Sequence, residues 1–312
     1  MSKIALMFPG QGAQTVGMGR DLYDKYPKAK EIINLAGDEL KEIIFEGPEE
    51  TLKLTKYAQP AIFTVSMAAF EVFKEYCGVS VNEFVAAGHS LGEYSALCAA
   101  GFFNFKTGLA MVKARGEFIQ KASEKTPGAM AAIIGIEKSD VENVCKQASS
   151  TGICEAVNFN SPKQIVIAGT VAAVNKALEL AVAAGAIKTV ILNVSGPFHS
   201  SLMTSASDDM SKELEKYDFN MPFFGVYANC DALLMMDAST VKERLVKQIK
   251  SPVRWNEIIQ NIIAAGCDKF VEIGPGKVLS GLLRKIDRSK KALNLNIEDS
   301  ASLRKTLEEL GK

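Results

Sequence analysis

Short apolar runs alternate with longer amphipathic stretches along most of this 312-residue chain. A short apolar run between turn residues is typical of a buried strand, and an amphipathic stretch is typical of a surface helix. The runs predict strands at 4–8, 84–87, 223–228, 269–273 and 292–296, and helices that include 239–250 and 255–265. Because strands and helices alternate, we expect an α/β fold with a parallel sheet covered by helices.

The stretch at 126–195 has a different order of predicted elements. It predicts strands at 129–136, 153–158, 164–168 and 189–194 with helices at 138–149 and 171–184, which is the β-α-β-β-α-β order of a ferredoxin-like unit. Turn residues bracket it at 126–128 and 195–197. We therefore expect a small ferredoxin-like subdomain at 126–195 inserted into a large domain formed by 1–125 and 196–312, with a ligand cleft between them.

The sequence G-H-S-L-G at 88–92 places Ser90 between two glycines. A predicted strand precedes it and a run of small, helix-forming residues follows it. Strand, tight turn and helix are the context of a nucleophile elbow, so the large domain is expected to be hydrolase-like. The free N–H groups at the start of the helix favour negative charge close to Ser90. The motif predicts acyl chemistry through a serine ester.

A serine hydroxyl needs a base, and histidine is the usual one. The chain has two histidines. His89 adjoins Ser90, but neighbouring side chains diverge at an elbow, so we expect His89 to pack beneath it. His199 follows the predicted domain junction, at the edge of the cleft, and we choose it as the base; a merely packed histidine is the alternative.

The group that orients the base is not marked by the sequence. No carboxylate stands out by its spacing, and a main-chain carbonyl could serve instead. The candidates are Asp140, Glu155, Asp208, Asp231 and Glu272.

An oxyanion hole needs two donors. The N–H of Leu91, directly after the nucleophile, is the expected first donor. The glycine-rich loop at 8–14 follows the first strand and is expected to supply the second. A phosphate-binding interpretation of this loop is weaker, because the G-x-G-x-x-G pattern fails at Thr15.

Composition excludes several classes of protein. The 36 basic and 36 acidic residues balance, which does not suggest a nucleic-acid partner. The longest apolar runs are too short to cross a bilayer, and residues 4–8 are interpreted as a strand rather than a leader. Six scattered cysteines without a C-x-x-C pair indicate reduced, buried thiols in a cytoplasmic protein, with no disulfide or zinc site.

Five motifs together resemble the malonyl-CoA:acyl carrier protein transacylases of fatty-acid synthesis, in order over nearly the whole chain. They are P-G-Q-G-A-Q at 9–14, G-H-S-L-G-E-Y-S at 88–95, Arg115 in K-A-R-G-E-F, G-P-F-H at 196–199 and Q-I-K-S-P-V-R-W at 248–255.

The resemblance implies roles for the residues of these motifs. Ser90 would carry the malonyl ester, and His199 would act as general base and then as acid. Leu91 and Gln11 would supply the oxyanion N–H groups. Gln248 would orient His199 through its main-chain carbonyl, so that no carboxylate is needed.

By the same resemblance, Arg115 would hold the free carboxylate of the malonyl group. A guanidinium forms a planar, two-pronged match to a carboxylate. Without the resemblance, Arg115 would be taken for a solvated helix residue. The substrates would be malonyl-CoA and the phosphopantetheine thiol of holo-acyl carrier protein, with no separate cofactor.

A basic stretch lies near the C-terminus. Its cations, with one intervening Asp287, are Arg284, Lys285, Arg288, Lys290 and Lys291. Because acyl carrier proteins are acidic, the stretch is a candidate docking face, and an ordinary solvated helix end is the alternative. Nothing in the sequence demands more than a monomer.

Four other functions compete. The same chemistry could serve polyketide assembly, or the elbow could belong to a serine esterase or thioesterase. Methylmalonyl transfer is less favoured, because Phe198 before the histidine resembles the malonyl-selective pattern. An inactive adaptor is disfavoured because Ser90 and His199 are both present.

Overall fold

The computed structural model describes residues 3–287, 289 and 291–312. Its larger sheet has the strand order β10-β9-β1-β2-β7-β8. The strands are β1 (Ile4–Phe8), β2 (Phe84–Gly88), β7 (Val226–Tyr227), β8 (Leu234–Met235), β9 (Lys269–Ile273) and β10 (Leu293–Ile297). Every pairing is parallel except that of β7 with β8, which is antiparallel. The predicted parallel sheet is therefore present, with one antiparallel edge strand that the sequence pattern did not indicate.

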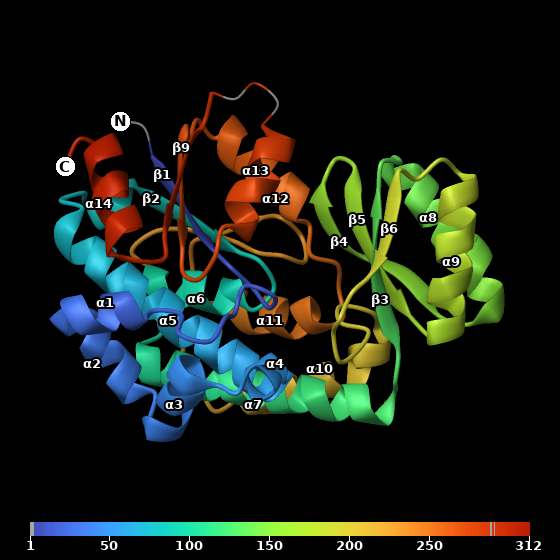
Figure 1. Ribbon diagram of the computed structural model, residues 1–312, viewed down its shortest axis with the longest axis horizontal. Helices are drawn as coiled ribbons and strands as arrows, with labels where there is room; N and C mark the ends of the chain where they lie inside the picture. Colours follow the sequence, from blue (N-terminus) through green and yellow to red (C-terminus); the bar gives the residue numbers. More distant parts are fainter. Residues whose placement is uncertain (1–2, 288, 290) are drawn as a thin grey trace.

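The alternation of side chains along β1 explains why helices cover both faces of this sheet. Leu6 and Phe8 belong to one apolar core, and Ala5 and Met7 belong to another, because successive strand residues point to opposite faces. Helices α5, α6 and α7 contribute to the first core, and α12 and α13 contribute to the second (Figure 1).

The helices of this larger part were predicted only in part. The predicted helices at 239–250 and 255–265 correspond to α11 and α12. The helices are α1 (Arg20–Lys25), α2 (Pro27–Leu35), α3 (Asp38–Glu46), α4 (Glu49–Lys53), α5 (Thr55–Tyr76), α6 (Gly92–Ala100), α7 (Phe105–Lys125), α10 (Thr204–Leu214), α11 (Val241–Ile249), α12 (Trp255–Ala264), α13 (Val278–Ile286) and α14 (Ser300–Glu309), with short 3-10 turns at Val81–Glu83 and Ser201–Met203.

Three strand predictions were too long. The run at 129–136 forms a strand only as far as Ile134. The run at 223–228 forms only the two-residue strand β7, because Phe223 instead donates its N–H to the carbonyl of Ala100 and its side chain is exposed. The run at 189–194 forms a strand only as far as Ile191, and the N–H of Leu192 makes one further hydrogen bond, to the carbonyl of Met130 at 2.9 Å, before the chain leaves the smaller sheet.

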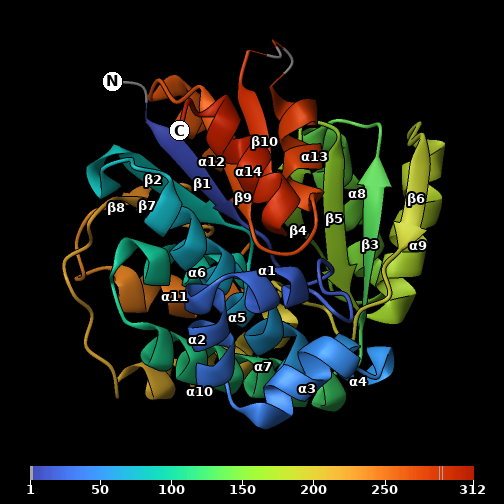
Figure 2. The same cartoon turned by 60° about the vertical axis from the view of Figure 1, so that its left-hand side comes forward.

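A second sheet stands beside the first, with the order β4-β5-β3-β6 and antiparallel pairing throughout (Figures 1 and 2). Its elements follow one another as β3 (Ala129–Ile134), α8 (Lys138–Ala148), a 3-10 turn (Ser149–Thr151), β4 (Cys154–Ser161), β5 (Gln164–Gly169), α9 (Val171–Ala183) and β6 (Lys188–Ile191). This is the β-α-β-β-α-β order that the sequence predicted. The subdomain boundaries at 126 and 196 stay a prediction.

Main-chain hydrogen bonds join the smaller sheet to the larger part of the protein. The N–H of Phe159 donates to the carbonyl of Val253 at 2.9 Å, and the N–H of Val253 donates to the carbonyl of Val157 at 2.8 Å. Val253 lies five residues after Gln248. Strand β4 is therefore fixed next to the segment that carries Gln248.

In the part of the chain that the structure describes, no helix combines the length and the apolar character needed to cross a membrane. The six cysteines are free thiols, of which Cys230 is partly buried and the others are buried.

Candidate active site

The nucleophile elbow forms where β2 ends and α6 begins. Ser90 has a φ of +53°, in the left-handed region that non-glycine residues rarely adopt. The elbow is pressed against β1: the N–H of His89 donates to the carbonyl of Phe8 at 3.0 Å. A Cβ at Gly92 would lie 2.1 Å from that same oxygen. The glycines thus allow α6 to approach β1 closely enough to present Ser90 above the sheet.

Ser90 and His199 form a hydrogen-bonded pair, with 2.7 Å between the serine Oγ and the histidine Nε2. The other ring nitrogen, Nδ1, lies 2.8 Å from the main-chain oxygen of Gln248. A carbonyl oxygen can only accept, so Nδ1 carries the proton and Nε2 is free to accept from the serine hydroxyl. The main-chain carbonyl of Gln248 thus occupies the place of the third group.

Four of the five carboxylates considered from the sequence have other partners. Glu155 accepts from the N–H of Ser201, and Asp231 pairs with Arg244. Glu272 accepts two N–H groups at the start of α13, and Asp140 caps α8. No bond from Asp208 to His199 is present among the described residues.

The surroundings of His199 keep it neutral. Burial, together with the nearby positive charge of Arg115, lowers the pKa of His199 to about 3. Its backbone φ is +62°, so both members of the pair are held in a sparsely populated conformation. His89 points elsewhere: its Nε2 lies 2.8 Å from the Oδ1 of Asn160, and its ring lies against Trp255.

The two expected oxyanion donors lie on either side of the contact between the elbow and the loop after β1. A Cβ at Gly10 would lie 2.4 Å from the carbonyl oxygen of His89, so the loop main chain lies directly against the elbow. Among the main-chain hydrogen bonds of the described residues, none uses the N–H of Leu91 or of Gln11. The side chain of Gln11 donates to Thr55 at 3.3 Å.

Arg115, on α7, is buried, with 1% of its surface exposed. Its Nη1 donates to the Oε1 of Gln59 at 2.6 Å, and its Nη2 donates to the Oε1 of Gln248 at 3.0 Å and to the Oγ of Ser90 at 3.2 Å. The guanidinium also lies 5.5 Å from the centre of the Tyr94 ring. No ion pair to Arg115 occurs within the described ranges. Neutral groups therefore hold a buried positive charge beside the serine.

Sequence reasoning missed three polar residues of this site: Gln59, Glu93 and Asn229. All three are buried, with at most 2% of their surface exposed. Gln59 carries a weak signal, because it is a polar residue within the short apolar run at 58–63. Asn229 lies at the carboxyl end of β7, which is where ligand-site residues gather in open α/β sheets.

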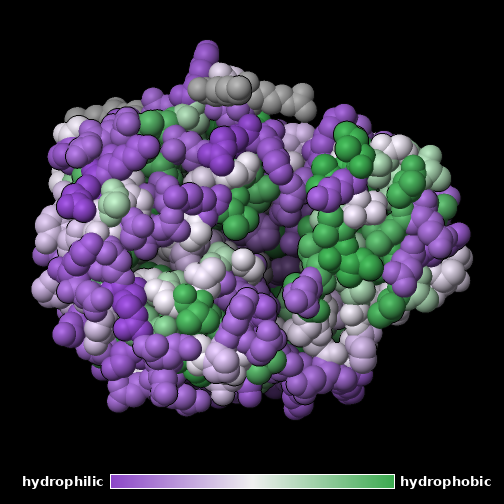
Figure 3. All heavy atoms as spheres, viewed as in Figure 1, coloured by the Kyte–Doolittle hydropathy of each residue, from purple (hydrophilic) through white to green (hydrophobic). Residues whose placement is uncertain are grey.

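A cavity of about 280 Å³ opens onto Ser90 and His199. Gln11 and Gly12 line it from the larger part, while Met130, Asn158 and residues 192–194 line it from the smaller sheet and the chain that follows it. Figure 3 shows the surface hollowed between the two parts. The described residues include no group of three or more His, Cys, Asp or Glu placed to hold a metal ion.

Comparisons with known proteins agree with this geometry. A family profile described as the acyl transferase domain matches residues 6–304. The malonyl CoA-acyl carrier protein transacylase of Bacillus subtilis is 44% identical over 308 residues, covering 97% of this chain and 96% of the relative. The enzyme of that name from Escherichia coli K12 is 40% identical over 300 residues, covering 95% and 96%.

Solved structures show the same similarity. A malonyl-transacylase in complex with its type II polyketide synthase acyl carrier protein superposes with a TM-score of 0.93 at 39% identity, covering 99% of this chain and 100% of that one. A crystal structure described as MCAT from Streptococcus pneumoniae superposes with a TM-score of 0.92 at 41% identity, covering 98% of this chain and 100% of that one.

Proposed function

Because the chain belongs to the malonyl-CoA:acyl carrier protein transacylase family of acyl transferases, we propose that it moves a malonyl group from malonyl-CoA to the phosphopantetheine thiol of acyl carrier protein through an ester on Ser90. The observation that carries the proposal is the buried Arg115, whose guanidinium lies 3.2 Å from the Oγ of Ser90. A serine–histidine pair alone would suit many acyl groups, whereas a fixed cation beside the serine suits an acyl group that carries its own carboxylate.

The first half-reaction forms the ester. The Nε2 of His199 takes the proton of Ser90 as the Oγ attacks the thioester carbonyl. The N–H groups of Leu91 and Gln11 stabilise the oxyanion. As the intermediate collapses, the carbon–sulfur bond breaks and the CoA sulfur takes the proton from His199.

The second half-reaction runs the same steps with a new thiol. The phosphopantetheine thiol gives its proton to His199 and attacks the ester carbonyl. The bond to the Oγ of Ser90 breaks, and the serine regains its proton. Both thioesters are substrates, and no separate cofactor is needed for this proton and acyl transfer. We place the reaction in the cytoplasm, which suits six free thiols.

Arg115 would select the acyl group. A malonyl carboxylate would form a charge-assisted pair with the guanidinium, whereas an acetyl group would leave the buried cation without a partner, at a cost of about 1–3 kcal/mol. The bound carboxylate would also offset the positive charge that lowers the pKa of His199. The preferred substrate would therefore strengthen the base that activates Ser90.

We propose that acyl carrier protein docks near the end of α13. Arg284 and Lys285 lie there and are exposed. The Nζ of Lys285 also lies 2.7 Å from the Oε1 of Gln164 on the smaller sheet, so the basic side chains lie where the two parts of the protein meet. Of the other cations of the predicted docking face, Lys291 is exposed, and Arg288 and Lys290 lie outside the described residues.

Incubation with malonyl-CoA and holo-acyl carrier protein tests the function against its alternatives. The proposal predicts malonyl-carrier as the main product. Free malonate that accumulates equally with and without the carrier would indicate a hydrolase instead. Carriers of fatty-acid and of polyketide synthesis, tested side by side, distinguish the proposed role in fatty-acid elongation from the polyketide role.

A further inference from the structure

Glu93 lies three residues after the nucleophile, within the first turn of α6, and has no exposed surface. One of its oxygens, Oε2, accepts two hydrogen bonds, from the main-chain N–H of Asn229 at 3.1 Å and from the Nε2 of Gln248 at 2.7 Å. The other oxygen, Oε1, has no hydrogen-bond partner among the described residues. A single buried oxygen thus joins two elements that both contact Ser90.

The first connection runs through Asn229 to the elbow. The side-chain oxygen of Asn229 accepts from the N–H of Ser90 at 2.7 Å, and its side-chain nitrogen donates to the carbonyl of Gly88 at 2.7 Å. Asn229 therefore spans the turn that holds Ser90 at positive φ. Since its own N–H donates to Glu93, the main chain of the asparagine is fixed as well as its side chain.

The second connection runs through Gln248 to Arg115. The Nε2 of Gln248 also donates to the carbonyl of Ser90 at 2.8 Å, while its Oε1 accepts from Arg115 at 3.0 Å. Two acceptors at one end of the amide and a donor at the other define its orientation. If the acceptor on Glu93 were lost, the amide would keep only its bonds to Ser90 and Arg115, and we expect the position of its oxygen, which accepts from Arg115, to be less well fixed.

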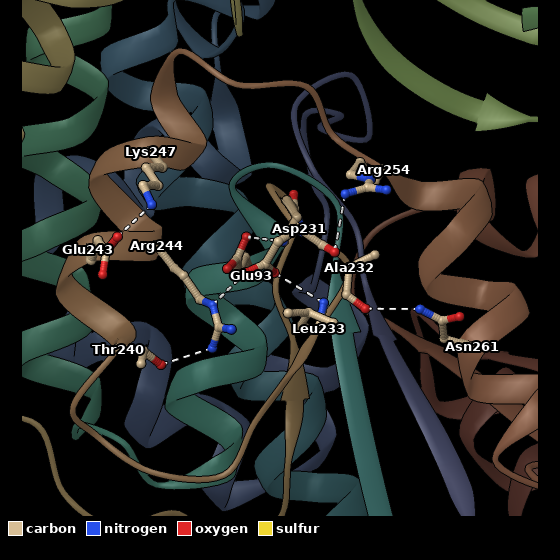
Figure 4. Close-up of polar contacts among 11 residues, drawn as sticks. Glu93, Asp231, Ala232, Leu233, Thr240, Glu243, Arg244, Lys247, Arg254 and Asn261 are labelled. Carbon is tan, nitrogen blue, oxygen red and sulfur yellow. Dashed lines mark hydrogen bonds and ion pairs between the residues drawn. The ribbon is translucent and has the colours of Figure 1, made fainter.

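The loop that carries Asn229 is itself anchored from outside. Arg244 pairs with the side chain of Asp231 at 2.8 Å, Arg254 donates to the carbonyl of Asp231 at 3.3 Å, and Asn261 donates to the carbonyl of Ala232 at 3.0 Å (Figure 4). Figure 4 shows Glu93 beside this loop. The external anchors set the position of the loop, and Glu93 ties it to the elbow.

We propose that Glu93 is a positioning residue: its Oε2 fixes Ser90 through Asn229 and fixes Arg115 through Gln248, so that one buried acceptor aligns the nucleophile with the cation that selects the acyl group. The connection to Ser90 stands on its own, and the connection to Arg115 rests on the proposed function.

The role depends on where the acceptor lies rather than on its charge. Burial raises the pKa of Glu93 to about 7, so the group is partly protonated at neutral pH. A proton on Oε1 leaves Oε2 free to accept both hydrogen bonds. The hydrogen bonds from Gln248 and Asn229 partly offset the effect of burial on this pKa; of the charged groups, Arg115 on α7 favours the anion and Asp231 opposes it.

Three substitutions separate placement from charge. Glu93→Gln keeps an acceptor oxygen at the same reach without the charge. Glu93→Asp keeps the charge but withdraws the acceptor by one methylene, and Glu93→Leu removes the acceptor at similar volume. The readout is the rate at which a fluorophosphonate probe labels Ser90, because this rate reports the nucleophile whatever acyl group the protein prefers. Thermal unfolding confirms that each variant is folded.

We expect labelling of Glu93→Gln within about threefold of the unsubstituted protein, and labelling of Glu93→Asp and Glu93→Leu slower by about tenfold or more, since about 1.4 kcal/mol corresponds to a factor of ten. Labelling of Glu93→Asp that is faster than that of Glu93→Gln would overturn the proposal, as would native labelling of Glu93→Leu. If Glu93→Leu does not fold, the order of Gln and Asp decides.

The connection to Arg115 is tested with the same variants and acyl-CoA substrates. Glu93→Asp should lose malonyl-over-acetyl preference as well as rate, whereas Glu93→Gln should keep the preference; an unchanged preference in Glu93→Asp would contradict this connection. If the unsubstituted protein is labelled by the probe but is not malonylated, the proposed function fails, while the labelling order still tests Glu93.

Discussion

The Nη2 of Arg115 lies 3.2 Å from the Oγ of Ser90, and the other hydrogen bonds of the guanidinium go to the amide oxygens of Gln59 and Gln248. A buried cation held by neutral groups keeps its full charge beside the nucleophile. Leaving such a charge without a contacting counter-ion is unfavourable, and no ion pair to Arg115 occurs among the described residues, so a ligand that brings a carboxylate would form the pair that the free site lacks. We therefore expect the free site already to favour an acyl group that carries a carboxylate.

Replacing Arg115 by alanine should change the acyl preference more than it changes the serine chemistry. We expect the malonyl-CoA loading rate at low substrate concentration to fall by roughly 10²-fold, because a charge-assisted pair is lost. Acetyl-CoA loading should be retained or rise, since the positive charge that lowers the pKa of His199 is gone.

Single-turnover loading with each thioester measures both effects. Arg115→Lys keeps the charge but loses the two-pronged geometry of the guanidinium, so its malonyl-CoA loading rate should lie between those of the unsubstituted protein and Arg115→Ala. Equal losses for malonyl and acetyl groups would show that Arg115 supports the fold of the site rather than its selectivity.

The free enzyme should keep its base in the active form at mildly acidic pH. With the pKa of His199 lowered to about 3, the imidazole stays neutral far below the ordinary histidine range. The pH profile of kcat/KM, which reports the free enzyme, should therefore show no fall with a midpoint near 6.5 between pH 8 and pH 5. A fall centred there would mean that His199 is less buried in solution.

Glu93 should make stability depend on pH with a definite sign. Its pKa is raised from 4.5 to about 7 in the folded protein, so the folded protein binds the proton more tightly than the unfolded chain does. The resulting contribution to the free energy of unfolding is complete below pH 4.5 and is lost as the pH rises to about 7. The Glu93→Gln variant lacks this titration. The native free energy of unfolding, relative to that of the variant, should increase by up to about 1.4 kcal/mol for each pH unit lowered from 7 to 4.5.

Urea unfolding of both proteins at several pH values measures this difference, and comparing the pair removes the opposing contribution of the buried histidines. A difference that stays constant across the range would show that the carboxyl group is not shifted.

A methyl group at Gly92 should weaken the contact between the elbow and the sheet. Its Cβ would lie 2.1 Å from the oxygen of Phe8 and 2.9 Å from that of Pro9, both of them main-chain atoms. We expect Gly92→Ala to cost about 2 kcal/mol or more of unfolding free energy and to slow acylation. Gly281→Ala is the matched control, because on α13 its Cβ would meet only a side-chain atom of Arg284 at 4.0 Å. The stability of Gly281→Ala should be equal to or higher than that of the unsubstituted protein. Chemical unfolding of the two variants compares them directly. Equal stabilities of Gly92→Ala and Gly281→Ala would contradict the close approach at Gly92.

Sequence periodicity predicted the elements whose burial is regular. Strands β1 and β9 have the predicted bounds, and the order of elements in the smaller sheet is the predicted one. The bounds of β7 and the existence of β8 were not predicted. These two-residue strands form because they pair with β2 and with each other, and no local alternation of apolar residues marks them. Residues 192–194 continue an apolar run, yet they line the cavity instead of extending β6.

The residues of the site also differ in how clearly the sequence marks them. Ser90 is marked by its local turn and His199 by its place after the predicted domain junction, whereas only the motif resemblance singled out Gln248 and Arg115. Glu93 and Asn229 could not be paired from the sequence, because 136 positions separate them and only the sheet order brings the end of β7 beside α6. Burial of a charged residue such as Arg115 likewise depends on packing that no local pattern encodes.

The most direct test of the central claim is the intact mass of the protein after brief exposure to malonyl-CoA, acetyl-CoA or methylmalonyl-CoA, for the unsubstituted chain and for Ser90→Ala. We predict one malonyl adduct, formed with malonyl-CoA in preference to the other two, absent in Ser90→Ala and lost when holo-acyl carrier protein is added. A malonyl adduct that survives in Ser90→Ala would contradict the account, because the nucleophile would then be another residue.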